Sequence, residues 1–510
     1  MGIFASSRPN SRKSSGQSMR TNYKQQMTIG TVPISEIEFD IFSRHEITPI
    51  LMSLQHLYIH EKDTVEEVVN FIKLDINRDG SDKLGCTGLN YWEILVLGSV
   101  RLGCNLDYDA LQDLADNHKN LRRILRVGPY DDNRYPRSTI HDNLSKLTAE
   151  TIHEIDRRIV DIGHKFNPEA IERVRGDSFV LKKNIHYPTD TNLIFDGIRK
   201  TIELSVKIAE AHHILGWRQH AHLLGKFKKI RRRIEKAARS RGKDREEQLF
   251  RLYKEVIKEA HKLTDRALST IQAFQALKKA SKEDINIFWD GVISNLYFFV
   301  AGTEYVCDLA ERRMINGETI PNPEKVFSLF EPDTELINRG KVPVPIEFGH
   351  RVLIIEDSVG FIVHAEVMGI GITDDKILAD VMERLQEQYN EKIRSASFDK
   401  GFWSPANLKE LSQRVAIACL PKKGGRSQAD HIRESCRRFG EARRKHAGVE
   451  SAIHALVAGN GLDRCRDKGP DGYRRYFALA VLGRNLHTLG KILINQERER
   501  RGLKVLQTRS

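Results

Sequence analysis

The sequence predicts an α/β protein in which a helical block interrupts a mixed β-sheet and a helical region precedes it. Three observations support this fold class. Short segments rich in β-branched and aromatic residues occur on both sides of residues 194–318. Residues 194–318 themselves carry apolar side chains at helical spacing. Helices then alternate with the later strands, which indicates a sheet flanked by helices.

Length and charge narrow the class of protein. The chain has 510 residues, enough for two or three domains, and 82 Lys and Arg against 69 Asp and Glu give a net charge of +13. This excess suits an acidic partner such as nucleic acid. The six cysteines form no Cys-x-x-Cys pair, so they indicate neither a zinc site nor a disulfide framework. The scattered cysteines make a reducing cytosol the expected location. The most apolar window, 285–301, contains Asp290 and Asn295, so we expect no membrane span.

The N-terminal third is predicted to be helical. Residues 1–35 are polar and should form a disordered tail, and residues 36–135 should form a helical, DNA end-binding domain. Its helices are expected at 65–74, 91–102 and 108–125. The last helix is basic near its end, so Lys119, Arg122 and Arg123 are candidate DNA contacts. The alternative is a domain used only for packing or dimerisation.

The first strand of the core is predicted at 178–187, within GDSFVLKKNIHYPTD, and Asp177 precedes it. Aspartate is unfavourable on a buried strand unless something binds it. Asp177 is therefore either a turn residue after Gly176 or part of a site. The core domain should comprise residues 136–193 and 319–493.

The helical insertion at 194–318 contains a strongly basic segment, KFKKIRRRIEKAARSRGK, between its first two helices, expected at 198–209 and 249–274. A third helix is expected at 284–313. A charge run is often only a solvated helical face, but this density of positive charge favours phosphate contacts. The candidate residues are Lys226, Lys228, Lys229, Arg231, Arg232 and Arg233.

Strands resume after the insertion. They are expected at 326–330, 351–356, 360–368, 394–398 and 414–420. The last contains VAIACLP, a continuous apolar run typical of a strand covered on both faces. Helices are expected at 375–393, 405–411, 429–458 and 473–493, followed by a basic tail at 494–510.

Two further acids complete a candidate site. Asp399, in SFDKGFWS, follows a strand at the end where open α/β sheets bind ligands. Glu450, in RRKHAGVESAIHAL, lies on a later helix. Each has a structural alternative, a turn residue for Asp399 and a surface charge for Glu450. Together with Asp177, the three carboxylates could hold two Mg²⁺ or Mn²⁺ ions, which prefer oxygen ligands.

Several segments resemble the DDE transposases of bacterial insertion sequences, most closely the ISNCY-like group. They are NYWEILVLGSVRLGCNLDYDALQDLADNHKNLRRIL, GDSFVLKKNIHYPTD, KVFSLFEPDTELINRGK, PIEFGHRVLIIED, SFDKGFWS and HAGVESAIHALVAGNGLDRCRDKGPDGYRRYFALAVLGRNLHTLG. The resemblance implies an RNase H-like core with Asp177, Asp399 and Glu450 as the metal-binding catalytic triad. It also implies double-stranded DNA as partner (transposon ends and target), a homodimer in the DNA complex, and a nucleoid-associated protein.

The resemblance departs from the family pattern on the glutamate helix. Related proteins carry Tyr, Arg and Lys around the glutamate where this chain has Arg443, His446 and Val457. Arg443 and His446 can still contact phosphate, whereas Val457 cannot. The implied activity is metal-dependent DNA cleavage and strand transfer. The alternatives are a degenerate or domesticated DNA-binding protein, which Val457 favours, and a nuclease without strand transfer.

Overall fold

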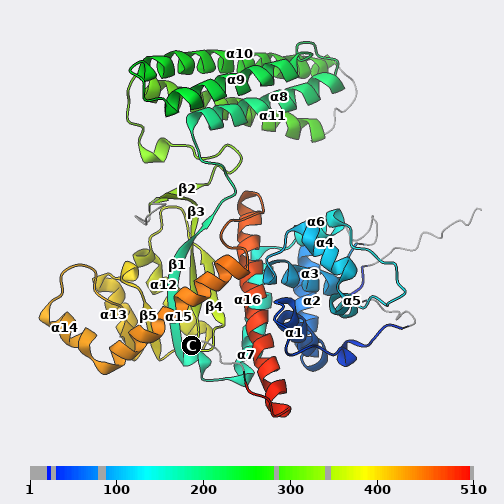
Figure 1. Ribbon diagram of the computed structural model, residues 1–510, viewed down its shortest axis with the longest axis vertical. Helices are drawn as coiled ribbons and strands as arrows, with labels where there is room; N and C mark the ends of the chain where they lie inside the picture. Colours follow the sequence, from blue (N-terminus) through cyan, green and yellow to red (C-terminus); the bar gives the residue numbers. More distant parts are fainter. Residues whose placement is uncertain (1–19, 24–29, 79–87, 281–286, 339–345, 506–510) are drawn as a thin grey trace, which may run out of the picture. The chain divides into compact units, whose positions relative to one another are not determined.

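A computed structural model describes residues 20–23, 30–78, 88–280, 287–338 and 346–505. The chain divides into two compact units (Figure 1). One comprises Met1–Lys182 with His350–Ser510, and the other comprises Lys183–Gly349. The second unit is thus longer than the insertion expected at 194–318. It also takes in a short strand and the beginning of the strand that follows.

The described residues form one mixed sheet. Its strands are β1 (Arg173–Lys182), β2 (Glu335–Asn338), β3 (Ile346–Glu356), β4 (Ile362–Val367), β5 (Ser395–Phe398) and β6 (Ile417–Cys419). The order is β2-β3-β1-β5-β6, and β4 also pairs with β3. The β3–β4 pair is antiparallel, whereas β1–β5 and β5–β6 are parallel. The predicted α/β class with a mixed sheet is confirmed.

Helices precede the sheet as expected, but they do not form a separate domain. They are α1 (Ile47–His60), α2 (Lys62–Ile76), α3 (Tyr91–Gly103), α4 (Tyr108–Asn117), α5 (Lys119–Ile124), α6 (Arg137–Leu144) and α7 (Ala149–Phe166). Their buried residues belong to the same hydrophobic cluster as those of the sheet. This shared core could not be predicted from the sequence, because a helical pattern shows that a face is apolar but not which element covers it.

The long helix α16 (Gly469–Arg500) joins these parts, and it packs against α1, α3, α7 and β4. Glycines permit the close approach: a Cβ on Gly490 would lie 2.0 Å from the Pro49 carbonyl oxygen, and one on Gly483 would lie 2.6 Å from Gly103 Cα. Within the described chain, α16 alone is long and apolar enough to cross a bilayer, yet 78% of its most apolar window is buried in the protein. This burial is that of a helix in the core of the protein.

Four helices flank the later strands: α12 (Asp374–Gln388), α13 (Pro405–Arg414), α14 (Gln428–Ser435) and α15 (Arg437–Gly459). The single helix expected at 429–458 is divided because Cys436 is extended, with φ −60° and ψ 136°. Helix α15 packs against β1, β5 and β6 and crosses the sheet in Figure 1 (orange). It therefore covers the strands that carry the candidate acids.

The second unit contains four long helices with a hydrophobic core of their own. They are α8 (Asp190–Ala211), α9 (His220–Arg239), α10 (Arg245–Ala280) and α11 (Ile287–Met314). The basic segment, expected between two helices, itself forms most of α9. Phe227, Ile230 and Ile234 recur at helical spacing and are buried in this core. The opposite, charged side of α9 faces solvent.

Several local expectations were wrong. Residues 326–330 form no strand, the helix expected at 108–125 breaks at His118 into α4 and α5, and α16 continues beyond residue 493. Strand β6 is only half-buried at Ile417 and Ala418, because it forms the edge of the sheet. Parts of the expected disordered tail are ordered. Ile34 is buried, and Thr21 accepts a backbone hydrogen bond from Tyr91, while residues 1–19, 24–29 and 506–510 lie outside the described part.

Candidate active site

The sheet places Asp177 and Asp399 next to each other. Asp177 is in the middle of β1 and not at its head, as the sequence suggested, and Asp399 follows the last residue of β5. The register pairs Gly176 with Phe398. Asp177 and Asp399 are the next residues on these two parallel strands, so their backbones are neighbours although the sequence separates them widely.

Both acids belong to the face of the sheet that α15 covers. Arg175 and Ser397 are paired in the register, and both contact this helix. Arg175 donates to the Lys445 carbonyl oxygen at 2.7 Å, and the Ser397 hydroxyl lies 3.2 Å from His446 Nδ1. Side chains two residues apart on a strand share a face. Asp177 therefore projects toward α15, and Asp399 follows the same alternation where β5 ends.

Glu450 lies on α15, one helical turn after His446, and its side chain is exposed. Burial lowers the pKa of His446, while the carboxylates of Asp399 and Glu450 raise it and Arg175 lowers it further. All three charged groups are thus within electrostatic reach of one imidazole. Val449, on the adjacent side of the helix, is fully buried and fixes the face that α15 turns to the sheet.

Asp177, Asp399 and Glu450 do not form a complete metal-binding site in this structure. Among the described residues, no three His, Cys, Asp or Glu side chains lie close enough to hold a metal ion as a group. Asp177 and Asp399 nonetheless supply the carboxylate oxygens that Mg²⁺ prefers, and Mg²⁺ commonly uses one or two protein carboxylates together with water and substrate phosphate. The donor chemistry of these carboxylates fits such an ion, and the three acids would have to come closer together to hold it as a group.

Arg175 anchors α15 to the sheet, a role that the sequence did not reveal. Its Nε lies 2.6 Å from Glu356 Oε1 on β3, and both side chains are largely buried. Burial raises the pKa of Glu356 to about 7, against the opposing effect of Arg175. A Cβ on Gly448 would lie 2.0 Å from Arg175 Nη1, so a larger residue at this point of the helix would have to displace the guanidinium. The one feature of the sequence that could have indicated this anchoring role is the position of Arg175, two residues before Asp177.

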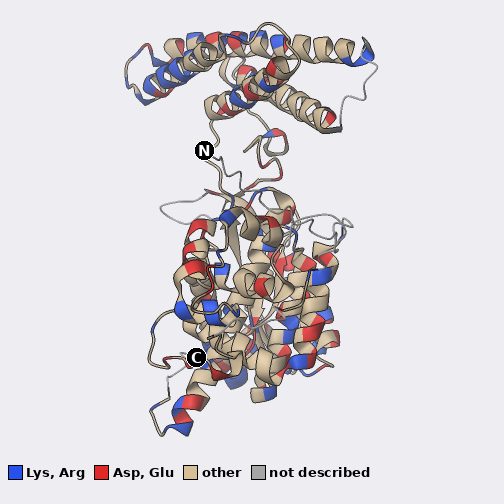
Figure 2. Ribbon diagram, turned by 90° about the vertical axis from the view of Figure 1, so that its right-hand side faces the viewer, with Lys and Arg blue, Asp and Glu red and all other residues tan. Residues whose placement is uncertain are grey.

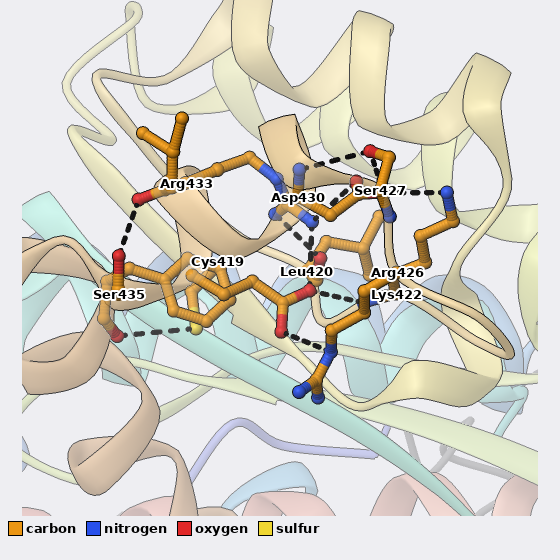
Figure 3. A network of polar contacts seen from close by, with 11 residues as sticks. Cys419, Leu420, Lys422, Arg426, Ser427, Asp430, Arg433 and Ser435 are labelled. Atoms are coloured by element: carbon orange, nitrogen blue, oxygen red, sulfur yellow. Dashed lines mark hydrogen bonds and ion pairs between the residues drawn. The ribbon is translucent and has the colours of Figure 1, made fainter.

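The segment before α15 is braced by polar contacts (Figure 3). Lys422 Nζ lies 2.7 Å from Asp430 Oδ2, and Arg426 Nε lies 3.1 Å from Glu434 Oε2. Arg433 donates to the Leu420 carbonyl oxygen at 2.9 Å. The Lys422 ammonium and the Ser427 hydroxyl and amide keep the pKa of Asp430 well below its usual range. These bonds fix two basic side chains on the loop between β6 and α14.

Of the candidate DNA contacts in the N-terminal helices, Arg122 has its hydrogen-bond donors in use. It donates to the carbonyl oxygens of Asp116, Asp131 and Asn133 at 2.7–3.1 Å, which closes the loop after α5. Lys119 is exposed. Arg123 is half-buried, and its side chain donates to Asn120 Oδ1 at 3.4 Å. The prediction of DNA contact is therefore weaker for Arg122 than for Lys119 and Arg123.

The six basic candidates on α9 divide into two groups. Lys226, Arg231 and Arg233 form ion pairs with Glu259, Glu235 and Glu255. Lys228, Lys229 and Arg232 are exposed and form no ion pair within the described part of the chain. Lys236 and Arg239 extend this exposed group along the helix, and Lys and Arg gather at one end of the unit in Figure 2. We refer to Lys228, Lys229, Arg232, Lys236 and Arg239 as the α9 basic face.

Comparisons with known proteins give no family for this chain. No protein-family model, no curated protein and no solved structure matches it. The class that fold and site define is thus a mixed α/β protein with paired carboxylates at a sheet–helix junction, and any finer assignment depends on its residues.

Proposed function

We propose that the protein is a metal-dependent transposase with an RNase H-like core and a catalytic triad of Asp177, Asp399 and Glu450. The observation that carries the proposal is the adjacent placement of Asp177 and Asp399 on parallel strands, under the helix that bears Glu450. Asp399 also accepts a hydrogen bond from the Gly401 amide at 2.6 Å and so caps the turn that follows β5. Two carboxylates at neighbouring positions repel each other, and a bound cation would relieve that repulsion.

The strand order gives independent support. An antiparallel pair, β3 and β4, lies beside β1, and β1 continues into the parallel strands β5 and β6. An order of β4-β3-β1-β5-β6 supports the proposed RNase H-like core, in which the acids would lie on the central strands. The helical unit after β1 accounts for the long interval before Asp399.

The reaction that we propose breaks the 3′ oxygen–phosphorus bond at a transposon end by attack of water on phosphorus, leaving a 3′ hydroxyl. That hydroxyl then attacks a target phosphodiester and displaces its 3′ oxygen. When bound, the divalent ions activate the attacking oxygen and stabilise the leaving one. Asp177 and Asp399 would hold them, and Glu450 would complete the site once DNA is bound.

The α9 basic face, the exposed Lys119 and the half-buried Arg123 would hold DNA through its phosphates. Phosphate contacts supply affinity without sequence preference. In such a complex we expect the protein to be a homodimer, with one copy bound to each transposon end. Both statements depend on the proposed function.

The test uses the full chain and duplexes carrying the inverted repeats that flank its reading frame. With Mg²⁺ or Mn²⁺ we expect 3′ hydroxyl ends and joined products, and no product with Asp177→Asn, Asp399→Asn or Glu450→Gln. These variants should retain DNA affinity. Mg²⁺ should also raise the melting temperature of the native protein, since binding stabilises the folded state, and not that of Asp399→Asn. Cleavage that persists in any of the three variants would exclude this triad.

A second candidate is a DNA-binding protein that recognises transposon ends without cutting. The absence of a three-residue metal group among the described residues favours it. So does Val457, which is half-buried and packs against the core at a position where the transposases it resembles carry a lysine. Specific binding of the inverted repeat without cleavage in either metal would support this candidate over the first.

A further inference from the structure

A small pocket beside Asp399 gathers positive charge. Its volume is about 300 Å³, and it is bounded by the end of β5, the loop between β6 and α14, and α15. The charged or titratable lining residues are Asp399, Lys400, Lys422, Arg426, Arg443 and His446. Phe398 and Cys419, both almost completely buried, and Pro421 add apolar surface. The pocket thus combines several cations and one carboxylate with an apolar wall.

The cations are held in different ways. Asp430 and Glu434 fix Lys422 and Arg426 (Figure 3), so these side chains are positioned before a ligand arrives. Lys400 and Arg443 are exposed and form no ion pair with any described residue. Positive charge is therefore in excess on the pocket wall, and an anion would balance it.

Size and composition limit the ligand. Ligand pockets usually span about 300–1,000 Å³, so this one lies at the small end and cannot admit a duplex. Arginine and lysine together favour phosphate, and the apolar wall suits a sugar or base. We propose that the pocket binds one nucleotide of a DNA strand, with its phosphate between Lys400 and Arg443. This inference deepens the proposed function and rests on it for the source of the nucleotide.

The position of the pocket gives the nucleotide a role. Asp399 borders it, so a bound nucleotide would belong to the strand whose phosphate reaches the carboxylates. The pocket would then fix the register of that strand, and Lys400, Lys422, Arg426 and Arg443 would act as positioning residues.

The test is isothermal titration calorimetry of the full chain in EDTA with thymidine 3′,5′-bisphosphate, inorganic phosphate and thymidine as separate probes. EDTA removes metals, so the carboxylates contribute no cation bridge. We expect the bisphosphate to bind more tightly than either other probe. Arg443→Gln and Lys400→Gln should each weaken its binding about tenfold, the effect of one charge-assisted hydrogen bond.

Two matched controls separate the pocket from general charge. Arg444→Gln changes the adjacent exposed arginine of α15, and Lys409→Gln an exposed lysine of α13; neither lines the pocket. Both should bind the bisphosphate within about twofold of the native protein. Equal losses in Arg444→Gln and Arg443→Gln would overturn the proposal, as would inorganic phosphate binding as tightly as the bisphosphate, or no bisphosphate binding at all.

This result and the cleavage result are independent. Bisphosphate binding with the expected variant effects, but without cleavage, would leave the pocket established and refute the catalytic proposal. Cleavage without bisphosphate binding would refute the pocket alone.

Discussion

Asp156 on α7 is buried, and its carboxylate oxygens accept hydrogen bonds from Asn485 of α16 at 2.9 and 3.1 Å. Burial raises its pKa to about 7, and the bonds from Asn485 only partly oppose this effect. Asp156 thus differs from the catalytic candidates, which keep access to solvent. It connects two helices of the core and contributes to the pH dependence of stability.

The sign of that dependence follows from proton binding. Between about pH 4 and pH 7 the folded protein keeps the Asp156 proton while the unfolded chain loses it, so the free energy of unfolding falls as pH rises. The fall is on the order of a few kcal/mol and ends above the folded pKa. Asp156→Asn should remove this part of the slope in urea unfolding measured from pH 4.5 to 8. Asp132→Asn, at an exposed position, should leave the slope unchanged; identical slopes in all three proteins would contradict the assignment.

Among the elements, α15 decides whether the candidate site can assemble, because it carries Glu450, His446 and Arg443. Arg175 and Gly448 set its position on the sheet. Gly448→Ala should push the buried guanidinium away from Glu356 and from the Lys445 carbonyl, and overpacking of this kind costs about 1–3 kcal/mol. The free energy of unfolding measured in urea and the rate of metal-dependent cleavage should both fall.

The same helix provides the control. A Cβ on Gly440 meets nothing within 4 Å. Gly440→Ala should be neutral or stabilise the helix by up to about 1 kcal/mol, since alanine has the higher helix propensity. If Gly448→Ala were as stable and as active as Gly440→Ala, Arg175 would not be an anchor of α15.

Helix α9 allows a second prediction at this scale. Each phosphate contact contributes about 0.9 to the salt slope of duplex DNA binding. Lys228→Gln and Arg232→Gln should each reduce that slope by about this amount, because both residues are exposed and unpaired in the described structure. Lys226→Gln is the matched control, since Lys226 already pairs with Glu259. Binding titrations at several salt concentrations measure the slopes, and equal slopes for native, Lys228→Gln and Arg232→Gln proteins would make α9 a solvated face only.

Over the whole molecule, two units with separate cores predict two unfolding transitions. Trp92 and Trp403 report on the first unit, and Trp217 and Trp289 on the second. In single-tryptophan variants, Gly490→Ala should lower the unfolding midpoints reported by the fluorescence of Trp92 and of Trp403 by the same amount. The reason is that the added Cβ meets Pro49, at the place where α16 connects the N-terminal helices to the sheet. The Trp217 midpoint should not move. A shift seen by Trp92 alone would mean that the N-terminal helices unfold independently.

Sequence patterns located most helices and strands because their signals are local. Apolar spacing placed α2, α3, α8, α10 and α11, and β-rich runs placed β3, β4, β5 and β6, although α8 begins eight residues and β3 five residues before the expected start. They also selected Asp177 beside a strand, Asp399 at a strand end and Glu450 on a helix, and the family resemblance joined the three acids as a triad. Breaks such as Cys436 and His118 were missed, since a single extended residue leaves no periodic trace.

Tertiary structure alone decided which of these residues meet. Strand register makes Asp177 and Asp399 neighbours, and a carbonyl of α15 engages Arg175. Lys226, Arg231 and Arg233 form ion pairs with glutamates and are therefore not part of the α9 basic face. The guanidinium of Arg122 donates its hydrogen bonds to backbone carbonyls. The physical reason is the same in each case. The sequence determines the chemistry of a side chain, but its partners belong to segments far away along the chain, and only packing brings these segments together.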